Sequence, residues 1–391
     1  MVELAEIFRQ HGDEYRAKFG DRIPAQHLRA MRDIQDCRTA ILGGKLYLCP
    51  KCNRQRYSYH SCKNRHCPKC QNDQANGWLQ QQHHLLLPVT YFMVTFTLPA
   101  QLRPLARSNQ KTVYNVLFRA AAEALQKLAQ DPRFLGARIG MVGVLHTWTR
   151  ALVYHPHVHF IVTGGGLSQE NQWLPSRDGF LVPVRALSVI FRTKVRDYLR
   201  EANLAGEIDK KIWTKDWVVH SEPVGSGAAA FKYLAPYIFR VAISNNRIIN
   251  LHDGFVTFKY KESATDQTRI CTLTAEEFIR RFLQHILPLR LVKVRYYGLL
   301  SPRRRPLLDT ARKLLASASP KPNQISQLLR PQKRDCAKLD CPESKRPAQP
   351  DPPQVSTCPH CGGTMIVCGK LHPQRNSRRW FLAESSSGRS P

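Results

Sequence analysis

Four cysteines in two closely spaced pairs constrain the fold of this chain more than any other feature. Cys49 and Cys52 form one Cys-x-x-Cys pair, Cys67 and Cys70 form another, and 14 residues separate the two pairs. Two such pairs supply the tetrahedral four-sulfur set that structural zinc prefers. The stretch has too little apolar content to fold without a metal, so the spacing predicts a small zinc-binding domain.

Further thiols and imidazoles are candidate ligands for a second zinc site. They lie close to the first four cysteines and near the C-terminus: Cys37, His60, Cys62 and His66, then Cys336, Cys341, Cys358 and Cys361. For the first group the alternative is packing or hydrogen bonding within the same domain. For the second group the alternative is free thiols.

The charge of the chain predicts a nucleic-acid partner. The 59 Lys and Arg residues against 29 Asp and Glu give a formal net charge of +30, and cations of this density release counterions from phosphates. Seven Lys and Arg and no acidic residue lie between residues 45 and 70, interleaved with three tyrosines whose rings can stack on bases. We therefore expect the zinc-binding domain to contact DNA through Lys51, Arg54, Arg56, Lys63 and Arg65.

No segment of the sequence predicts a membrane or secreted protein. The first 20 residues are amphipathic and lack an apolar signal-peptide core. The most apolar stretch, residues 85–99, contains two prolines and is too short to span a bilayer. We expect a soluble cytoplasmic protein with no membrane partner.

Three histidines alternate at the start of an apolar strand and predict a catalytic site. His155, His157 and His159 share one face of a strand, because side chains two apart point the same way. Imidazoles at this spacing can converge on one divalent ion. Two chemistries use such a strand: histidine attack on a nucleotide phosphate, as in histidine-triad hydrolases, and metal-dependent nicking of DNA by a tyrosine.

A pair of tyrosines downstream favours the second chemistry. Tyr233 and Tyr237 are four residues apart and would share one face of a helix. The alternative is two core aromatics at helical spacing. The histidine strand and the basic charge favour the catalytic interpretation.

These motifs together resemble the HUH-type, two-tyrosine rolling-circle transposases of bacterial insertion sequences, which carry an N-terminal zinc-binding domain. The residues that carry the resemblance lie in five segments: 37–71, 92–99 (FMVTFTLP), 146–167 (HTWTRALVYHPHVHFIVTGGGL), 233–248 (YLAPYIFRVAISNNRI) and 276–305.

The resemblance implies an α+β fold, in which a small Cys-rich zinc-binding domain precedes an HUH-endonuclease-like antiparallel sheet with helices. It implies single-strand cleavage and rejoining of DNA through 5′-phosphotyrosine intermediates with Mg²⁺ or Mn²⁺, beside structural zinc. The implied partner is DNA: insertion-sequence ends in single-stranded or hairpin form. The implied location is the bacterial nucleoid, in the cytoplasm. The resemblance is also compatible with a homo-oligomer.

The resemblance also assigns roles to single residues. The paired metal ligands map onto His157 and His159. His155, which shares their face, is a candidate third ligand or a phosphate contact, and His146 on the preceding strand is the other candidate. Tyr233 or Tyr237 attacks the phosphate. Arg240 positions phosphates, unless it is simply an exposed charge.

The predicted organisation has four parts: a helix plus zinc-binding domain (1–75), a catalytic domain (76–305), a basic Pro-rich linker (306–357) and a short Cys-containing tail (358–391). Within the catalytic domain, patterning predicts strands at Val89–Leu98, Met141–Thr149, His157–Thr163, Trp213–Val219 and Val292–Tyr297. A hairpin is expected at Asp253-Gly254 and an N-cap at Thr274. The competing hypotheses are a non-catalytic zinc DNA-binding regulator and a histidine-triad nucleotide hydrolase.

Overall fold

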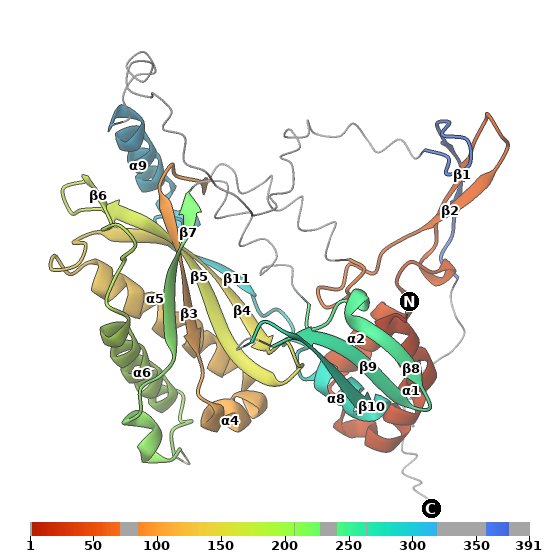
Figure 1. Cartoon of the computed structure of the whole chain (residues 1–391), viewed down its shortest axis with the longest axis horizontal. Coiled ribbons are helices and arrows are strands. Elements are labelled where there is room, and N and C mark those ends of the chain that lie inside the picture. Colours follow the sequence, from red (N-terminus) through yellow and green to blue (C-terminus); the bar gives the residue numbers. More distant parts are fainter. Residues whose placement is uncertain are drawn as a thin grey trace, which may run out of the picture. The chain divides into compact units, whose positions relative to one another are not determined.

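The computed structural model in Figure 1 describes residues 2–70, 85–206, 208–226, 241–262, 265–318 and 357–374. The chain divides into two compact units. The larger comprises residues 1–31 and 65–329, and the smaller comprises residues 32–64 and 330–391.

A six-stranded antiparallel sheet organises the larger unit. Its strand order is β11-β4-β5-β3-β7, and β6 pairs with β5 beside this path. The strands are β3 (Thr90–Thr97), β4 (Arg138–Trp148), β5 (Tyr154–Leu167), β6 (Trp173–Pro175), β7 (Val219–Ser226) and β11 (Val294–Gly298). The histidine strand is β5, in the middle of the sheet (Figure 1). The predicted α+β fold with an antiparallel sheet is confirmed.

One face of this sheet packs against two long helices. Phe92, Val94 and Phe96 of β3 join a core that includes the apolar sides of α5 (Gln110–Ala129) and α6 (Val184–Glu201). Figure 1 shows both helices running beside the sheet. Each fully buried phenylalanine stabilises this face by about 1.5–3 kcal/mol relative to an exposed one.

The opposite face is apolar along only part of its length. Tyr91 and Met93 contribute to a second cluster with Leu308 and Ala311 of α9 (Arg305–Ala318). Because alternate residues share a face, the next positions along β3, β4 and β5 extend this surface beyond the cluster. These positions carry polar side chains: Thr95, His146 and His159.

A second group of elements in the larger unit surrounds α8. Phe8 and Phe282 meet edge to face, with ring centroids 5.6 Å apart, and join the first helix of the chain to α8. The elements are α1 (Leu4–Phe19), the first half of α2 (Ala25–Asp36), α8 (Ala275–Leu283) and an antiparallel sheet of β8 (Ile248–His252), β9 (Phe255–Lys261) and β10 (Thr268–Thr274).

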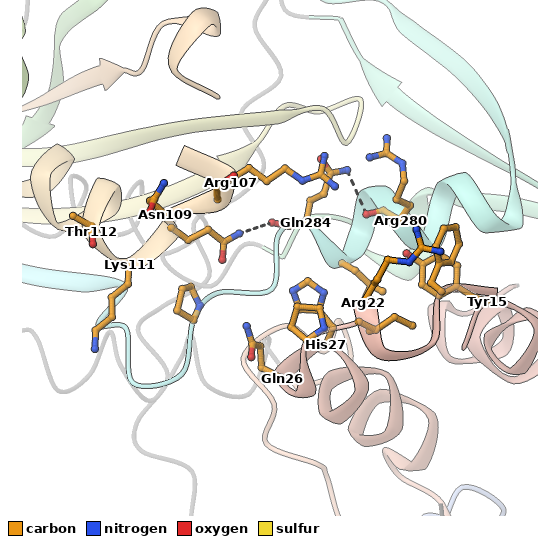
Figure 2. A pocket seen from close by; sticks show the side chains of 17 residues that line it. Tyr15, Arg22, Gln26, His27, Arg107, Asn109, Lys111, Thr112, Arg280 and Gln284 are labelled. Atoms are coloured by element: carbon orange, nitrogen blue, oxygen red, sulfur yellow. Dashed lines mark hydrogen bonds between the residues drawn. The ribbon is translucent and has the colours of Figure 1, made fainter. Parts of the chain in front are cut away.

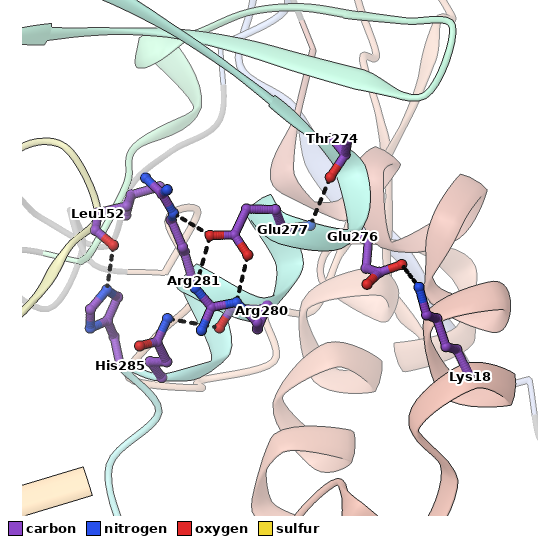
Figure 3. A network of polar contacts seen from close by, with 9 residues as sticks. Lys18, Leu152, Thr274, Glu276, Glu277, Arg280, Arg281 and His285 are labelled. Carbon is purple, nitrogen blue, oxygen red and sulfur yellow. Dashed lines mark hydrogen bonds and ion pairs between the residues drawn. The ribbon is translucent and has the colours of Figure 1, made fainter. Parts of the chain in front are cut away.

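Two local predictions are confirmed in this group. Asp253 and Gly254 have φ angles of 48° and 76° between the paired residues His252 and Phe255, and positive φ at both positions is the signature of a two-residue hairpin turn. The side chain of Thr274 accepts a hydrogen bond of 3.2 Å from the Glu277 backbone N–H at the start of α8 (Figure 3).

The smaller unit contains a three-stranded antiparallel sheet of order β12-β1-β2. The strands are β1 (Gly44–Leu48), β2 (Gln55–Tyr59) and β12 (Ile366–Leu371). Gly44 pairs with Tyr59 on one side and with Leu371 on the other. The C-terminal segment, expected to be a separate tail, therefore adds a strand to the sheet of the N-terminal cysteine region, because β1 offers it an open edge.

The remaining helices of the described residues are short. They are η1 (Gly20–Arg22), η2 (Ala40–Leu42), η4 (Ala100–Leu102), α4 (Arg103–Ser108), η5 (Lys210–Trp213), η6 (Asn245–Arg247) and η7 (Pro302–Arg304). Within the described residues, no helix combines the length and the apolar character that a membrane crossing requires.

Candidate active site

The register of β4 and β5 brings three histidines together. His157 lies directly opposite His146 of β4, and His159 lies opposite Val144 on the same side and Thr95 of β3 on the other. Directly opposed residues of antiparallel strands project from the same face. The three imidazoles therefore leave one face of the sheet at neighbouring positions.

These imidazoles form a compact group of nitrogen ligands. One ring nitrogen from each of His146, His157 and His159 lies within 4.8 Å of the others. The ring centroids are 5.5 Å apart for His146 and His157, 4.9 Å for His146 and His159, and 4.8 Å for His157 and His159. We call these three residues the histidine centre. Its imidazoles are a typical donor set for a transition-metal ion.

Hydrogen bonds orient two of the rings. His157 Nδ1 lies 2.7 Å from the carbonyl oxygen of His155, so Nδ1 carries the proton and Nε2 carries the lone pair that a metal uses. His159 Nδ1 lies 2.8 Å from the Thr95 hydroxyl. Such partners fix the ring orientation and the tautomer of metal-ligating histidines.

The predicted third ligand, His155, is not part of the histidine centre. Its Nδ1 accepts a hydrogen bond of 2.6 Å from an Arg103 guanidinium nitrogen, and burial, with a smaller contribution from Arg103, lowers the pKa of His155. His146 takes the third place, because the antiparallel register sets it opposite His157. The sequence offered both residues as candidates.

Buried and partly buried side chains of β4 and of the segment after α8 pack beside the histidine centre. Trp148 stacks on His146 at 4.9 Å and 24°, and its ring also faces His285 at 5.9 Å. Burial lowers the pKa of His285 to about 3, so that ring is neutral. Lys293 places its ammonium 5.4 Å from the Trp148 ring centroid, and burial lowers the pKa of this lysine to about 7.

The structure also regroups the predicted zinc ligands. Cys49 and Cys52 gather with Cys358 and Cys361, and the four sulfur atoms lie within 4.8 Å of one another. Cys67 and Cys70 are not members of this group. The predicted set of Cys49, Cys52, Cys67 and Cys70 is corrected accordingly. The prediction was wrong because each Cys-x-x-Cys pair supplies only two of the four ligands, and the spacing within one segment does not specify which two pairs share an ion.

Two adjoining cavities form a basic groove in the larger unit. The first, of about 640 Å³, is lined by residues of α1, η1, α2, α4, α5 and α8, among them Arg22, Arg107, Lys111 and Arg280 (Figure 2). The second, of about 530 Å³, shares Arg107 and Arg280 and continues to Arg103, which contacts His155. Among the residues that the structure describes, no Asp or Glu lines either cavity. The groove therefore suits a polyanion and ends beside the histidine strand.

Glu277 holds two arginines at this groove. Its carboxylate accepts hydrogen bonds from Arg280 (2.8 Å) and Arg281 (2.7 Å), as Figure 3 shows, and both arginines line the second cavity. These contacts, the one to Arg280 above all, lower the pKa of Glu277 to about 2. The carboxylate remains ionised and fixes the direction of both guanidinium groups.

Comparisons with known proteins decide the family. A family model described as a transposase matches residues 140–306, and one described as a transposase zinc-binding domain matches residues 7–98. The protein named as transposase y4qJ of Sinorhizobium fredii (strain NBRC 101917 / NGR234) is 40% identical over 344 residues, which cover 82% of this chain and 86% of that protein. The chain belongs to this family of transposases.

A second relative is the transposase for insertion sequence element IS801 of Pseudomonas savastanoi pv. phaseolicola. It is 31% identical over 288 residues, which cover 68% of each protein. No solved structure matches the chain. The resemblance to insertion-sequence transposases with an N-terminal zinc-binding domain is thereby confirmed.

The structure places the predicted DNA-contacting residues of this transposase in different environments. Four of them are exposed: Lys51, Arg54, Arg56 and Lys63. Arg65 is not, because its guanidinium is directed at the backbone carbonyls of Leu287, Pro288 and Leu291. Tyr233, Tyr237 and Arg240 lie outside the described residues.

Sequence reasoning about the transposase missed the cations of the basic groove. Arg22, Arg103, Arg107, Lys111 and Arg280 come from four separate elements, and no local motif connects them. Only the fold brings them together. The strand pattern around residue 146 did signal His146, but spacing alone could not rank it above His155.

Proposed function

We propose that this transposase cleaves and rejoins single strands of DNA at insertion-sequence ends by a rolling-circle mechanism, with a tyrosine as nucleophile and a divalent metal ion at the histidine centre. The convergence of His146, His157 and His159 on one face of the central sheet is the observation that carries this proposal. The membership in a transposase family supports DNA transposition as the reaction, and the strong positive charge of the chain supports a nucleic acid as the substrate.

The histidine centre fits a divalent metal ion. Three neutral imidazoles occupy three positions around an ion and leave the others for oxygen atoms of a phosphate or water. Imidazole is a better ligand for transition metals than for Mg²⁺, so this donor set favours Mn²⁺ over Mg²⁺. When bound, the ion would neutralise the charge that develops on the scissile phosphate. The chain's own contribution is to orient two of the three rings: the His155 carbonyl accepts a hydrogen bond from His157 Nδ1, and the Thr95 hydroxyl is hydrogen-bonded to His159 Nδ1.

The nucleophile in this proposal is Tyr233 or Tyr237. Its phenolic oxygen attacks the phosphorus, the bond from phosphorus to the 3′-oxygen breaks, and the proton passes to that oxygen. The products are a 5′-phosphotyrosine and a free 3′-hydroxyl. The reverse attack by a 3′-hydroxyl rejoins a strand and releases the tyrosine, so no external energy source is required. Two tyrosines allow two strand ends to be held in succession.

The basic groove supplies a path for the strand toward the histidine centre. Arg107 and Arg280 line both cavities and can contact successive phosphates, and Arg103 lies at the end next to His155. Contacts to phosphates position a strand without reading its sequence. Recognition of the particular ends is assigned to the exposed basic residues of the smaller unit.

Incubation of the full chain with single-stranded end DNA and Mn²⁺ tests the proposal. We expect a protein–DNA adduct that survives denaturation, that EDTA prevents, and that mass spectrometry maps to Tyr233 or Tyr237. The double variant Tyr233→Phe/Tyr237→Phe should give none, whereas Tyr296→Phe, a tyrosine of β11, should give the parental amount. An adduct formed by the double variant would contradict the proposed nucleophiles. DNA binding with no adduct under any metal would favour a non-catalytic regulator.

A further inference from the structure

Four thiols from opposite ends of the chain meet in the smaller unit. The sulfur atoms of Cys49 and Cys361 are 3.5 Å apart, and those of Cys52 and Cys358 are also 3.5 Å apart. All four sulfurs lie within 4.8 Å of one another. Four thiolates at about 2.3 Å from a tetrahedral zinc ion would be about 3.8 Å apart. The distances exceed the length of a disulfide bond by about 1.5 Å, so the geometry is that of a metal site.

The two halves of this group have the same backbone structure. The Asn53 N–H donates to the Cys49 carbonyl at 2.8 Å, and the Cys49 N–H donates to the Arg54 carbonyl at 2.9 Å. In the second half, the Gly362 N–H donates to the Cys358 carbonyl at 2.9 Å, and the Cys358 N–H donates to the Gly363 carbonyl at 2.8 Å.

The sequences of the two halves agree with this likeness. They read Cys-Pro-Lys-Cys-Asn and Cys-Pro-His-Cys-Gly, and the residue after the second cysteine has a positive φ in both, 55° at Asn53 and 68° at Gly362. Asn and Gly are the residues that most readily adopt this conformation. Two matching turns that each present a pair of thiols are the arrangement that structural zinc sites use.

The sheet holds the two turns together, but the part of the smaller unit that the structure describes has very little hydrophobic core. β1 precedes the first turn, β12 follows the second, and the two strands pair antiparallel. Among the described residues, the hydrophobic cluster beside this sheet has three buried members, Cys49, Cys358 and Met365, and two of them are thiols of the group. A sheet with so little buried apolar surface needs another source of stability, which a metal ion supplies.

We propose that Cys49, Cys52, Cys358 and Cys361 bind one structural zinc ion that fastens the C-terminal segment onto the zinc-binding domain. This site goes beyond the matched zinc-binding domain, which ends at residue 98, because two of its four ligands lie near the other end of the chain. The domain is therefore discontinuous: residues 357–374 complete it, across a sequence separation of 306 residues between Cys52 and Cys358. The proposal does not depend on the nicking mechanism.

The zinc content of the purified full chain, measured by mass spectrometry of the metal, tests this site. Cys358→Ser/Cys361→Ser should reduce the content by one zinc per chain, and Cys49→Ser/Cys52→Ser should do the same. The quadruple variant should also lose one ion, because all four thiols hold the same one. Cys368→Ser is the matched control: this exposed cysteine lies on β12 of the same segment, and its replacement should leave the zinc content unchanged.

Two outcomes would overturn the shared site. If the Cys358→Ser/Cys361→Ser chain keeps all its zinc, the C-terminal pair is not a ligand pair. If the quadruple variant loses two ions, the pairs belong to different sites. The Cys361→His variant controls for loss of zinc through unfolding. Histidine is also a zinc ligand, so this variant keeps four ligands at the site. In the cobalt-substituted chain, it should retain the ion and lose about a quarter of the sulfur-to-metal absorption that this site contributes, which is the part that the quadruple variant lacks. An unchanged absorption would contradict the proposal.

Discussion

Replacement of Arg65 by alanine should destabilise the fold without acting through DNA. The sequence suggested a DNA contact, but the Arg65 guanidinium donates hydrogen bonds to the carbonyls of Leu291 (2.7 Å), Pro288 (2.9 Å) and Leu287 (3.3 Å). Burial lowers the pKa of this arginine. The guanidinium therefore holds the backbone of the segment that follows α8 in its folded conformation.

The size of the effect follows from these contacts. A hydrogen bond to a charged group contributes about 1.5–3 kcal/mol, and three bonds to one guanidinium are not additive. We expect Arg65→Ala to lower the free energy of unfolding by about 3 kcal/mol. For a unit of this size, that corresponds to a fall in Tm of roughly 6–12 °C, measured by thermal denaturation without DNA.

Arg56→Ala is the matched control, because Arg56 is an exposed residue of β2. Its Tm should equal that of the parent, since surface substitutions usually change stability by less than about 0.5 kcal/mol. Its affinity for DNA should fall. The reasoning is refuted if Arg65→Ala melts like the parent and binds DNA as weakly as Arg56→Ala.

Three further predictions concern charges around the histidine centre and the groove. Arg103→Ala should raise the pKa of His155, measured by NMR titration, but not to its ordinary value, because burial is the larger cause of the shift; an unchanged pKa would show that Arg103 is not a cause. Burial lowers the pKa of Lys293 to about 7, so the unfolded chain binds a proton that the folded chain releases above that pH, and the free energy of unfolding should rise from pH 7 to pH 9. In Lys293→Met, urea denaturation should find a smaller rise, and an equal rise would contradict the shift. Arg107→Ala should weaken single-strand binding and reduce its log–log salt dependence by about 0.7, whereas an unchanged slope would remove Arg107 from the phosphate path.

The sequence predicted the strands wherever periodicity was strong. Phe92, Val94 and Phe96 alternate with residues that face the other cluster, and the expected strand 89–98 is observed as β3. The same periodicity placed His157 and His159 on one face of a central strand. These features are local, so a single sequence can reveal them.

Predictions that depended on tertiary contacts were less successful. The strand expected at Trp213–Val219 begins only at Val219, because Lys210–Trp213 forms a 3-10 turn and the Trp217 indole N–H donates to the Ile212 carbonyl at 3.1 Å. The pairing of the cysteine turns and the assembly of the basic groove also join residues from distant segments. No spacing rule within one segment can specify such contacts.

The choice between His146 and His155 tests the proposed centre most directly. We would measure Mn²⁺ binding by His146→Ala, His155→Ala and His159→Ala, together with the Mn²⁺ concentration that each variant needs to form the DNA adduct. The account predicts that His146→Ala and His159→Ala both lose Mn²⁺ affinity and adduct formation, while His155→Ala binds Mn²⁺ like the parent. Loss of Mn²⁺ binding in His155→Ala, with parental binding in His146→Ala, would contradict it.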